Sequence, residues 1–594
     1  MFKTVTGNIR YIKNAFHESK GYTFLIVLLN TLVSCMLALK VLAVGKLIDD
    51  AGAFQELGIS RITMDACLII VVYLLEYVFA SVQSYLNYKF TIRLNNRMED
   101  RYYSKLSCVK YAVLEDNDKN NLIYQAKDGI GKKFAEGFSR VLDLAGLVVR
   151  IGSMFFVILT KNVWTGLLLL VVFCCLLPLY RKIGEDNYEA YAESNKEFRR
   201  ARSYRLVVSD REYANERQVF GYFPFFNEKW KARYHSAIEK ELKASRQNHL
   251  KILVITAAVA ALTTLLSGVM LPALLNGSIT LGVYVVLVTQ LYNLVHYMSW
   301  NFSYIIDDLS ENQLYLNDFD AFMKLDEVSG ADSGAEASGD HLEIRVENLS
   351  FRYPGCEEYV LKNFSFVFRK GKHYAIVGKN GAGKTTLVKL LLGLYDDYEG
   401  KILINGTDLR RLSREEIHNV FSTVFQDYAK YALTVKENVL LDQVDRPEKQ
   451  QQAEDVLARL GVLGEIRQLR DGMNTYLGKI DQNGVDLSGG QWQKIAIARG
   501  AVPDAGVYIL DEPSSSLDPI SERNLYEIYN RIFKDRTTIL ITHRLGNTRD
   551  QDEILVLDAG SLVEHGHHTV LMEQKSVYYD MYIRQRSWYH EETL

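Results

Sequence analysis

A glycine-rich segment at residues 378–386, GKNGAGKTT, contains residue types that can wrap around a chain of phosphate groups. It matches G-x-x-x-x-G-K-[ST] and follows an apolar strand-like run, HYAIV, and precedes a helical run, LVKLLLGL. Glycines let backbone N–H groups turn toward phosphate oxygens, and the following helix presents its positive end. Lys384 would reach the terminal phosphates, and Thr385 would bind Mg²⁺. The expected lining is Gly378, Asn380, Gly381, Gly383, Lys384, Thr385 and Thr386.

A second strand-like run ends in two carboxylates. VYILDE, residues 507–512, is apolar up to Asp511 and Glu512. Parallel α/β sheets collect ligands at the carboxyl ends of their strands, which would place this pair beside the phosphate loop. Asp511 suits the shell of a Mg²⁺ ion, and Glu512 can polarise a water that attacks a phosphate. An acidic pair after a strand can also be a helix cap, but the phosphate loop favours the metal and base roles.

LSGGQ, residues 487–491, opens the helical run WQKIAIAR. A helix that starts here presents a hydroxyl and free N–H groups at its N-terminus, although an ordinary capped helix would do the same. Together with the other motifs, however, this segment resembles the ATP-binding cassette (ABC) transporters over nearly the whole chain. The motifs that carry the resemblance, in chain order, are the phosphate loop, Gln426 in VFQD, LSGGQ, Asp511 and Glu512, SSLD at residues 515–518, and His543 in ITHR.

The resemblance implies a role for each motif. Tyr353 would stack on the adenine of ATP, and Gln426 would bind Mg²⁺ and sense substrate occupancy. Glu512 would act as general base, His543 would contact the γ-phosphate, and Asp518 would communicate across a dimer. Two ATP molecules would lie between two nucleotide domains, so one chain with one set of motifs is half a transporter. The expected catalytic residues are Glu512, His543, Gln426 and Lys384, and the residues contributed by the opposite chain are Ser488, Gly489, Gly490 and Gln491.

Further details of the sequence indicate which group of ABC transporters the chain resembles. LSGGQWQKIAIAR, with Trp492 after the signature, and VFQDYAKYALTVKENV are similar to bacterial peptide, lantibiotic-type and multidrug half-exporters. The segment before the signature, GKIDQNG at residues 478–484, departs from the G-E-x-G pattern of the commonest exporters. No cysteine peptidase domain precedes the apolar segments, which disfavours a leader-cleaving peptide exporter. The intact Glu512 and signature favour a homodimer, with a heterodimer left open.

The first half of the 594-residue chain contains six apolar segments. A bilayer takes about 20 residues of helix, so they predict an all-α membrane domain of six spans and exclude a soluble cassette ATPase. The net charge of -3 gives no basic excess for nucleic acid. Six cysteines without C-x-x-C or His spacing predict free thiols, mostly buried in apolar helices, and no zinc site. The segments are residues 22–48, 64–86, 138–159, 163–179, 250–275 and 279–300.

Lys and Arg gather before the first apolar segment, between the second and third, and between the fourth and fifth. Cytoplasmic loops collect positive charge, so both termini are expected inside. The two long inside loops predict helices that continue past the bilayer, with short turns near residues 114–124 and 209–222. From about residue 341, β-rich runs alternate with helical ones, which indicates an α/β domain. The expected domains are an amphipathic elbow helix at 1–20, the transmembrane domain at 21–325, a linker at 326–340 and the ATPase domain at 341–594.

Ionisable side chains within apolar helices are costly and usually face a partner or a cavity. Lys40, Glu76 and Arg150 are such residues. Counting along each helix places Glu76 and Arg150 at similar depth and Lys40 about 10 Å nearer the outside. We hypothesise that Glu76 pairs with Arg150, as part of a polar cavity or only for helix packing. The further lining expected for such a cavity is Gln83, Gln290 and His296.

These observations predict an ATP- and Mg²⁺-dependent export half-transporter of a bacterial cytoplasmic membrane. The expected fold is a six-helix exporter domain, domain-swapped in the dimer, fused to an α/β P-loop nucleotide-binding domain. The expected substrate is an amphipathic or hydrophobic small molecule, lipid or peptide. Two alternatives remain open, since the motor motifs carry no direction: an importer with the same fold, as in siderophore uptake, and a nucleotide-gated channel or regulator.

Overall fold

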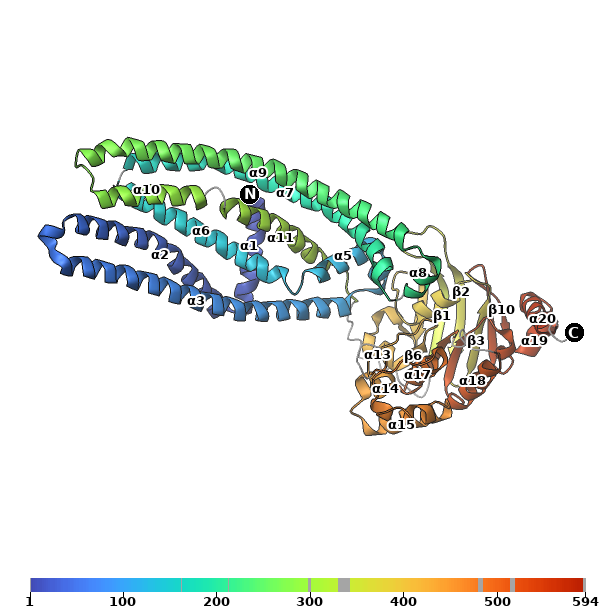
Figure 1. Ribbon diagram of the computed structural model, residues 1–594. Helices are drawn as coiled ribbons and strands as arrows, with labels where there is room; N and C mark the ends of the chain where they lie inside the picture. Colours follow the sequence, from blue (N-terminus) through green and yellow to red (C-terminus); the bar gives the residue numbers. More distant parts are fainter. Residues whose placement is uncertain are drawn as a thin grey trace. The chain divides into compact units, whose positions relative to one another are not determined.

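The computed structural model describes residues 2–161, 163–211, 213–297, 301–328, 342–478, 484–512 and 519–590 (Figure 1). The chain divides into two compact units. The helical unit comprises Met1–Cys108 and Asn117–Leu325, and the sheet unit comprises Val109–Asp116 and Asp326–Leu594. A short stretch from the middle of the helical half therefore clusters with the sheet unit.

Long helices build the helical unit. Among the described residues, α2, α3, α6 and α9 are long and apolar enough to cross a membrane. The fourth predicted segment begins α7, and the sixth contains α10, an apolar helix of 16 residues. The helices are α1 (Phe2–Glu18), α2 (Lys20–Gly52), α3 (Phe54–Cys108), α5 (Asn117–Asp128), α6 (Lys133–Lys161), α7 (Val163–Ser209), α8 (Ala214–Phe220), α9 (Phe223–Leu275), α10 (Leu281–His296) and α11 (Phe302–Met323).

Three helices continue far beyond their apolar segments. Helices α7 and α9 have 47 and 53 residues, and α3 spans 55 residues with a kink near its start at Gly58, whose backbone is not helical (φ +72°). At about 1.5 Å per residue each is roughly 70–80 Å long, more than twice the ~30 Å apolar thickness of a bilayer. The turn expected at 209–222 contains α8. The first turn starts earlier than expected, because Lys110 and Asp116 are extended and flank a separate helix, α4 (Tyr111–Glu115).

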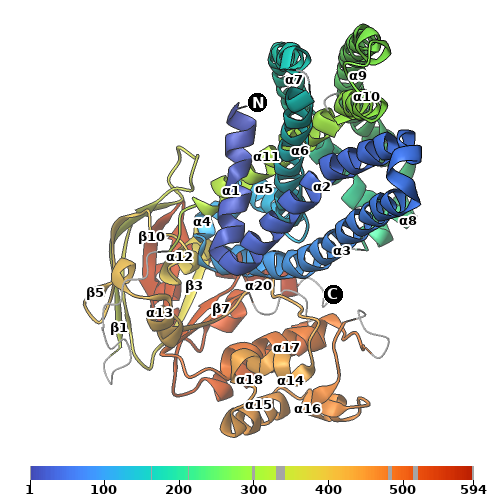
Figure 2. The same cartoon turned by 90° about the vertical axis from the view of Figure 1, so that its left-hand side faces the viewer.

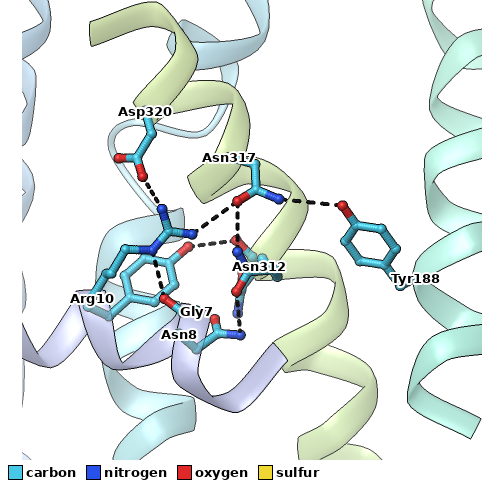
Figure 3. A network of polar contacts seen from close by, with 9 residues as sticks. Gly7, Asn8, Arg10, Tyr188, Asn312, Asn317 and Asp320 are labelled. Carbon is cyan, nitrogen blue, oxygen red and sulfur yellow. Dashed lines mark hydrogen bonds and ion pairs between the residues drawn. The ribbon is translucent and has the colours of Figure 1, made fainter. Parts of the chain in front are cut away.

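Helix α1 is bound to α11 by a network of polar contacts (Figure 3). The guanidinium of Arg10 is paired with Asp320, and the buried Tyr11 hydroxyl donates to the carbonyl oxygen of Asn312 at 2.8 Å. Ile9 lies on the exposed part of the same helix. The polar residues of α1 therefore contribute to its packing on α11 as well as to its amphipathic pattern.

The predicted ion pair between Glu76 and Arg150 is wrong. Glu76 Oε2 lies 2.6 Å from Lys40 Nζ, whereas the Arg150 guanidinium lies 5.8 Å from the centre of the Tyr297 ring. Counting residues along a helix axis ignores the reach of the side chain. The long side chain of Lys40 extends from α2 far enough to meet Glu76 on α3.

The other residues expected to line that cavity have separate surroundings. Gln83 donates to Asn30 at 3.1 Å. Gln290 is fully buried, and its amide atoms have no hydrogen-bond partner among the described residues. His296 is exposed. The ion pair and the Asn30 contact thus join α2 to α3 rather than α3 to α6.

The cysteine prediction is partly wrong. All six cysteines are free, and the described residues contain no cluster of three or more metal-ligating side chains. Five of the six are exposed in the single chain and only Cys35 is half-buried. The apolar helices that carry most of them turn many apolar side chains outward, so an apolar environment on these helices does not mean burial within the protein.

The sheet unit contains two sheets. The first is antiparallel, in the order β2-β1-β4-β5: β1 (Glu343–Phe351), β2 (Leu361–Arg369), β4 (Glu399–Ile404) and β5 (Thr407–Asp408). The second has the order β10-β9-β3-β8-β7-β6, parallel except for β10. Its strands are β3 (His373–Gly378), β6 (Phe421–Val424), β7 (Val507–Asp511), β8 (Thr537–Ile541), β9 (Glu553–Asp558) and β10 (Ser561–Gly566).

Among the described residues, three hydrophobic cores line the parallel sheet, and one of them contains Ala375 and Val377 of β3 with Ile554 and Val556 of β9. Val507 and Ile509 of β7 face the core that includes the antiparallel sheet and α12, while Tyr508 and Leu510 face the core of α14–α18 (Figure 2). This alternation follows from the two-residue period of a strand. Besides α4, the helices are α12 (Lys384–Leu391), α13 (Arg414–Val420), α14 (Val435–Leu440), α15 (Pro447–Arg459), α16 (Leu463–Arg467), α17 (Gly489–Ala501), α18 (Pro519–Ile532), α19 (His568–Gln574) and α20 (Val577–His590).

Candidate nucleotide-binding site

The parallel register brings four predicted segments to one edge of the sheet. Ile541 at the end of β8 pairs with Ile376 of β3 and with Asp511 of β7, and Val424 at the end of β6 pairs with Leu510 of β7. The segments that follow these strands therefore leave the sheet side by side, at the edge where α/β sheets place ligands. They contain the phosphate loop, Gln426, Glu512 and His543.

The phosphate loop has backbone geometry that requires glycine at two positions. Gly383, which precedes α12, has φ +97°, and a Cβ there would lie 2.7 Å from Leu361 Cδ2. Gly378 has φ +154°, and a Cβ there would lie 2.3 Å from the carbonyl oxygen of Leu557. Side chains at either position would displace the loop, so the glycines keep its N–H groups available to an anion.

Lys384 is folded back over this loop. It is buried, and its Nζ donates to the carbonyl oxygens of Gly378 at 3.0 Å and Lys379 at 3.1 Å. Burial lowers the pKa of the Lys384 ammonium, which the nearby Glu512 and Asp511 carboxylates partly oppose. Phosphate oxygens in this loop would offer the ammonium acceptors of full negative charge.

Asp511 has a buried carboxylate oxygen without a protein partner. The residue is 2% exposed, and its Oδ1 has no hydrogen-bond partner among the described residues. Burial, followed by the charge of Glu512, raises the pKa of Asp511 to about 6, although Lys384 and a hydrogen bond with Thr385 act in the opposite direction. An unpartnered carboxylate oxygen beside a threonine hydroxyl fits the oxygen ligands that Mg²⁺ prefers.

Glu512 and His543 are in direct contact. Glu512 Oε1 lies 2.7 Å from His543 Nε2. Glu512 has a left-handed backbone (φ +45°), which is uncommon outside glycine, while its N–H still donates to Ile541 at 3.0 Å. Burial and the charge of Lys384 lower the pKa of His543, so the imidazole is neutral at pH 7 and can donate its N–H to the carboxylate.

Tyr353 lies beside the phosphate loop within an aromatic cluster. Its hydroxyl is 2.9 Å from Thr386 Oγ1, and its ring centre is 5.2 Å from that of Phe351 and 5.7 Å from that of Tyr395. Tyr395 and its neighbour Lys389 were not among the residues expected from the sequence. Thr386 and Lys389 are three residues apart on α12 and therefore share a face, a spacing that could have indicated Lys389.

The signature motif begins a helix in the other core. Ser488 caps α17 in a capping box: its Oγ accepts from the N–H of Gln491, and its own N–H donates to Gln491 Oε1 at 2.8 Å. Gly489 and Gly490 form the first turn of α17, whereas α12 belongs to the core with the antiparallel sheet (Figure 2). Asn380, Thr385 and Gln426 are exposed. Asp518, the SSLD segment and residues 479–483 lie outside the described residues.

Comparisons with known proteins give a consistent result. A family profile described as ABC transporter matches residues 361–515. The nisin transport ATP-binding protein of Lactococcus lactis subsp. lactis is 28% identical over 584 residues, covering 96% of this chain and 95% of that protein. The ATP-dependent lipid A-core flippase of Pseudomonas fluorescens is 30% identical over 448 residues, covering 73% and 72%. The structure of a bacterial Atm1-family ABC exporter with ATP bound matches with a TM-score of 0.78 at 21% identity, covering 96% and 99%.

The helical unit with membrane-length apolar helices and the sheet unit with a phosphate loop define an ABC exporter fold. The chain belongs to the ABC transporter family. It is a membrane-embedded exporter in which an ATP-binding domain couples ATP hydrolysis to transport. No observation favours the importer or channel alternatives.

Proposed function

We propose that this chain is one half of a homodimeric exporter of a bacterial cytoplasmic membrane. Its substrate would be an amphipathic peptide or a lipid-like compound. The names of its relatives support this choice, since they include proteins for nisin and subtilin transport and a lipid A-core flippase. The proposed mechanism of ATP hydrolysis is supported mainly by the Glu512–His543 contact, which lies at the same sheet edge as Lys384 and Asp511.

In this proposal ATP is held in a defined orientation at the sheet edge that carries the phosphate loop, Gln426, Asp511, Glu512 and His543, which we call the phosphate edge. Backbone N–H groups of the loop and the Lys384 ammonium bind the phosphates, and the Tyr353 ring stacks on adenine. Thr385, Asp511 and Gln426 would hold Mg²⁺. When bound, the ion neutralises charge that develops on the phosphate oxygens during hydrolysis.

Hydrolysis would depend on the residue pair at the ends of β7 and β8. Glu512 accepts a proton from the attacking water, and the water oxygen then bonds to the γ-phosphorus as the bond to ADP breaks. His543 holds the Glu512 carboxylate through its N–H and, once ATP is bound, contacts the γ-phosphate. Lys384 balances negative charge at the phosphates throughout.

The signature residues would act on the ATP of a second copy. Ser488, Gly489, Gly490 and Gln491 lie at the N-terminus of α17, in a different core from α12. Two copies facing each other would place this terminus over the partner's phosphate loop, with Asp518 at the dimer contact. We infer domain limits of 1–20, 21–325, 326–340 and 341–594 for elbow, membrane domain, linker and ATPase domain, with both termini in the cytoplasm.

The test is the ATPase rate and particle mass of the chain purified alone in lipid nanodiscs, beside its Glu512→Gln variant. We expect a dimer whose hydrolysis is lost in the variant while ATP binding persists. An inactive wild type at monomer mass would contradict the homodimer. Uptake of a labelled amphipathic peptide into inside-out vesicles, absent with Glu512→Gln, tests the direction; uptake only into right-side-out vesicles would contradict export.

A further inference from the structure

Helix α4 is bound to the sheet unit at both of its ends. The chain enters α4 from α3 and leaves it into α5, both in the helical unit, yet residues 109–116 cluster with the sheet unit (Figure 2). Before the helix, Lys110 Nζ lies 2.6 Å from Asp396 Oδ2. At its last residue, Glu115 Oε1 lies 2.7 Å from Lys389 Nζ. Two ion pairs thus connect this short helix to the region around α12.

The second of these ion pairs involves a cation that also lies over aromatic rings. Lys389 is on α12, three residues after Thr386 of the phosphate loop. Its Nζ lies 5.2 Å from the ring centre of Tyr111 in α4 and 5.9 Å from that of Tyr353. Burial opposes its charge, but the hydrogen bond with Glu115 raises the pKa of Lys389, so it remains a cation. One ammonium therefore contacts α4 and the proposed adenine-binding tyrosine together.

Tyr395 provides a second connection between the same elements. Its hydroxyl donates to the Glu115 carboxylate, and its ring centre lies 5.6 Å from that of Tyr111 and 5.7 Å from that of Tyr353. Glu115 accepts hydrogen bonds from both Lys389 and Tyr395, so a shift of this carboxylate changes the position of two neighbours of Tyr353. The Lys110–Asp396 pair lies at the other end of α4 and does not involve Glu115, Lys389 or Tyr395.

We propose that Lys389 is a positioning residue for the nucleotide base: Glu115 of docked α4 holds the Lys389 ammonium over Tyr353 and so sets the orientation of the ring on which adenine stacks. This inference rests on the proposed role of Tyr353. Its consequence is that undocking of α4 weakens ATP binding at the base and leaves the hydrolytic residues Glu512 and His543 unchanged.

The first test compares two variants that each remove one ion pair of α4. In the full-length chain in lipid nanodiscs, Glu115→Gln is expected to raise KM for ATP about three- to tenfold with kcat within about twofold, since the loss of one coupled contact changes affinity by that order. Asp396→Asn, the matched control, should leave KM within about twofold. Equal changes in the two variants, or a fall in kcat alone, would overturn the proposal.

Substitutions of Lys389 test the contact between its ammonium and the Tyr353 ring without changing a residue of α4. Lys389→Met is expected to reproduce the rise in KM of Glu115→Gln, and Lys389→Arg, which keeps the cation, should stay closer to the wild type. An unchanged KM in Lys389→Met would refute the role of the cation even if Glu115→Gln failed to fold.

The Tyr353→Leu variant tests the proposed adenine site separately from the proposed role of Lys389. Alone, it should raise KM for ATP; with Tyr353→Leu present, Glu115→Gln should add less than about twofold. An unchanged KM in Tyr353→Leu would refute the adenine site itself. A raised KM on which Glu115→Gln still has its full effect would refute only the connection through Lys389.

Discussion

Replacement of Asp511 by asparagine should stabilise the nucleotide-free protein. Burial raises the pKa of Asp511 from its ordinary 3.8 to about 6, so the folded state disfavours the ionised carboxylate. Each pKa unit corresponds to about 1.4 kcal/mol, which makes the cost of ionisation about 3 kcal/mol at pH 8. Asn has nearly the shape of the Asp side chain and carries no charge at any pH of the experiment. For a domain of 150–250 residues, this corresponds to a rise of about 6 °C or more in melting temperature.

The pH dependence has a defined sign. Because the folded pKa is above the unfolded one, the full cost is present above pH 6, declines as the pH falls through 6, and is absent below about pH 3.8. The difference in melting temperature between Asp511→Asn and wild type should therefore be largest at pH 8 and small at pH 4.5. Mg²⁺ with ATP should raise the melting temperature of the wild type more than that of Asp511→Asn, which lacks one of the residues proposed to hold the ion.

Asp408 provides the matched control for this experiment. Its carboxylate accepts hydrogen bonds from Arg410 Nη2 at 2.7 Å and Nε at 3.0 Å. Burial opposes ionisation here too, but the Arg410 bonds keep the pKa of Asp408 below its ordinary value. Asp408→Asn should therefore lower the melting temperature at pH 8. If Asp511→Asn also lowered it there, burial of an unpaired carboxylate would not describe this site.

Three further predictions follow from described contacts. Glu512→Gln should lower ATP hydrolysis at least about 100-fold while ATP still binds, because a general base contributes 10²–10⁴-fold; a wild-type rate would refute the assigned base. Gly383→Ala should lose ATP binding and about 1–3 kcal/mol of stability, because its Cβ would lie 2.7 Å from Leu361 Cδ2 at φ +97°; undiminished binding would contradict this geometry. Lys40→Met should lower the melting temperature by leaving Glu76 unpaired in apolar surroundings, and adding Glu76→Gln should restore most of it; equal melting temperatures of the single and double variants would contradict the pairing.

The phosphate edge could be predicted from sequence because its signals are local. Gly378 and Lys384 lie within one strand–loop–helix unit, and the register of the parallel sheet brings Asp511 to the same edge. The ABC fold follows from the order of these units. Long-range side-chain pairing could not be predicted in this way, since the contact between Lys40 and Glu76 depends on how far one side chain reaches between two helices.

The surroundings of α4 were also invisible in the sequence. The long inside loop predicts a turn near residues 114–124, but nothing local indicates that the Glu115 carboxylate meets Lys389, 274 residues away. The left-handed backbone of Glu512 has no sequence signal either, because a glutamate at that position has no preference for such angles. Both features result from tertiary packing around the sheet.

The exposed cysteines give the molecule its own labelling positions. Cys108 is the last residue of α3, where the chain passes from the helical unit toward α4. Cys356 lies three residues after Tyr353, and its backbone N–H donates to the carbonyl oxygen of Tyr353 at 3.0 Å to close a turn. With the other four thiols replaced by serine, spin or dye labels at these two native positions would report directly on the docking of α4 as nucleotide is added.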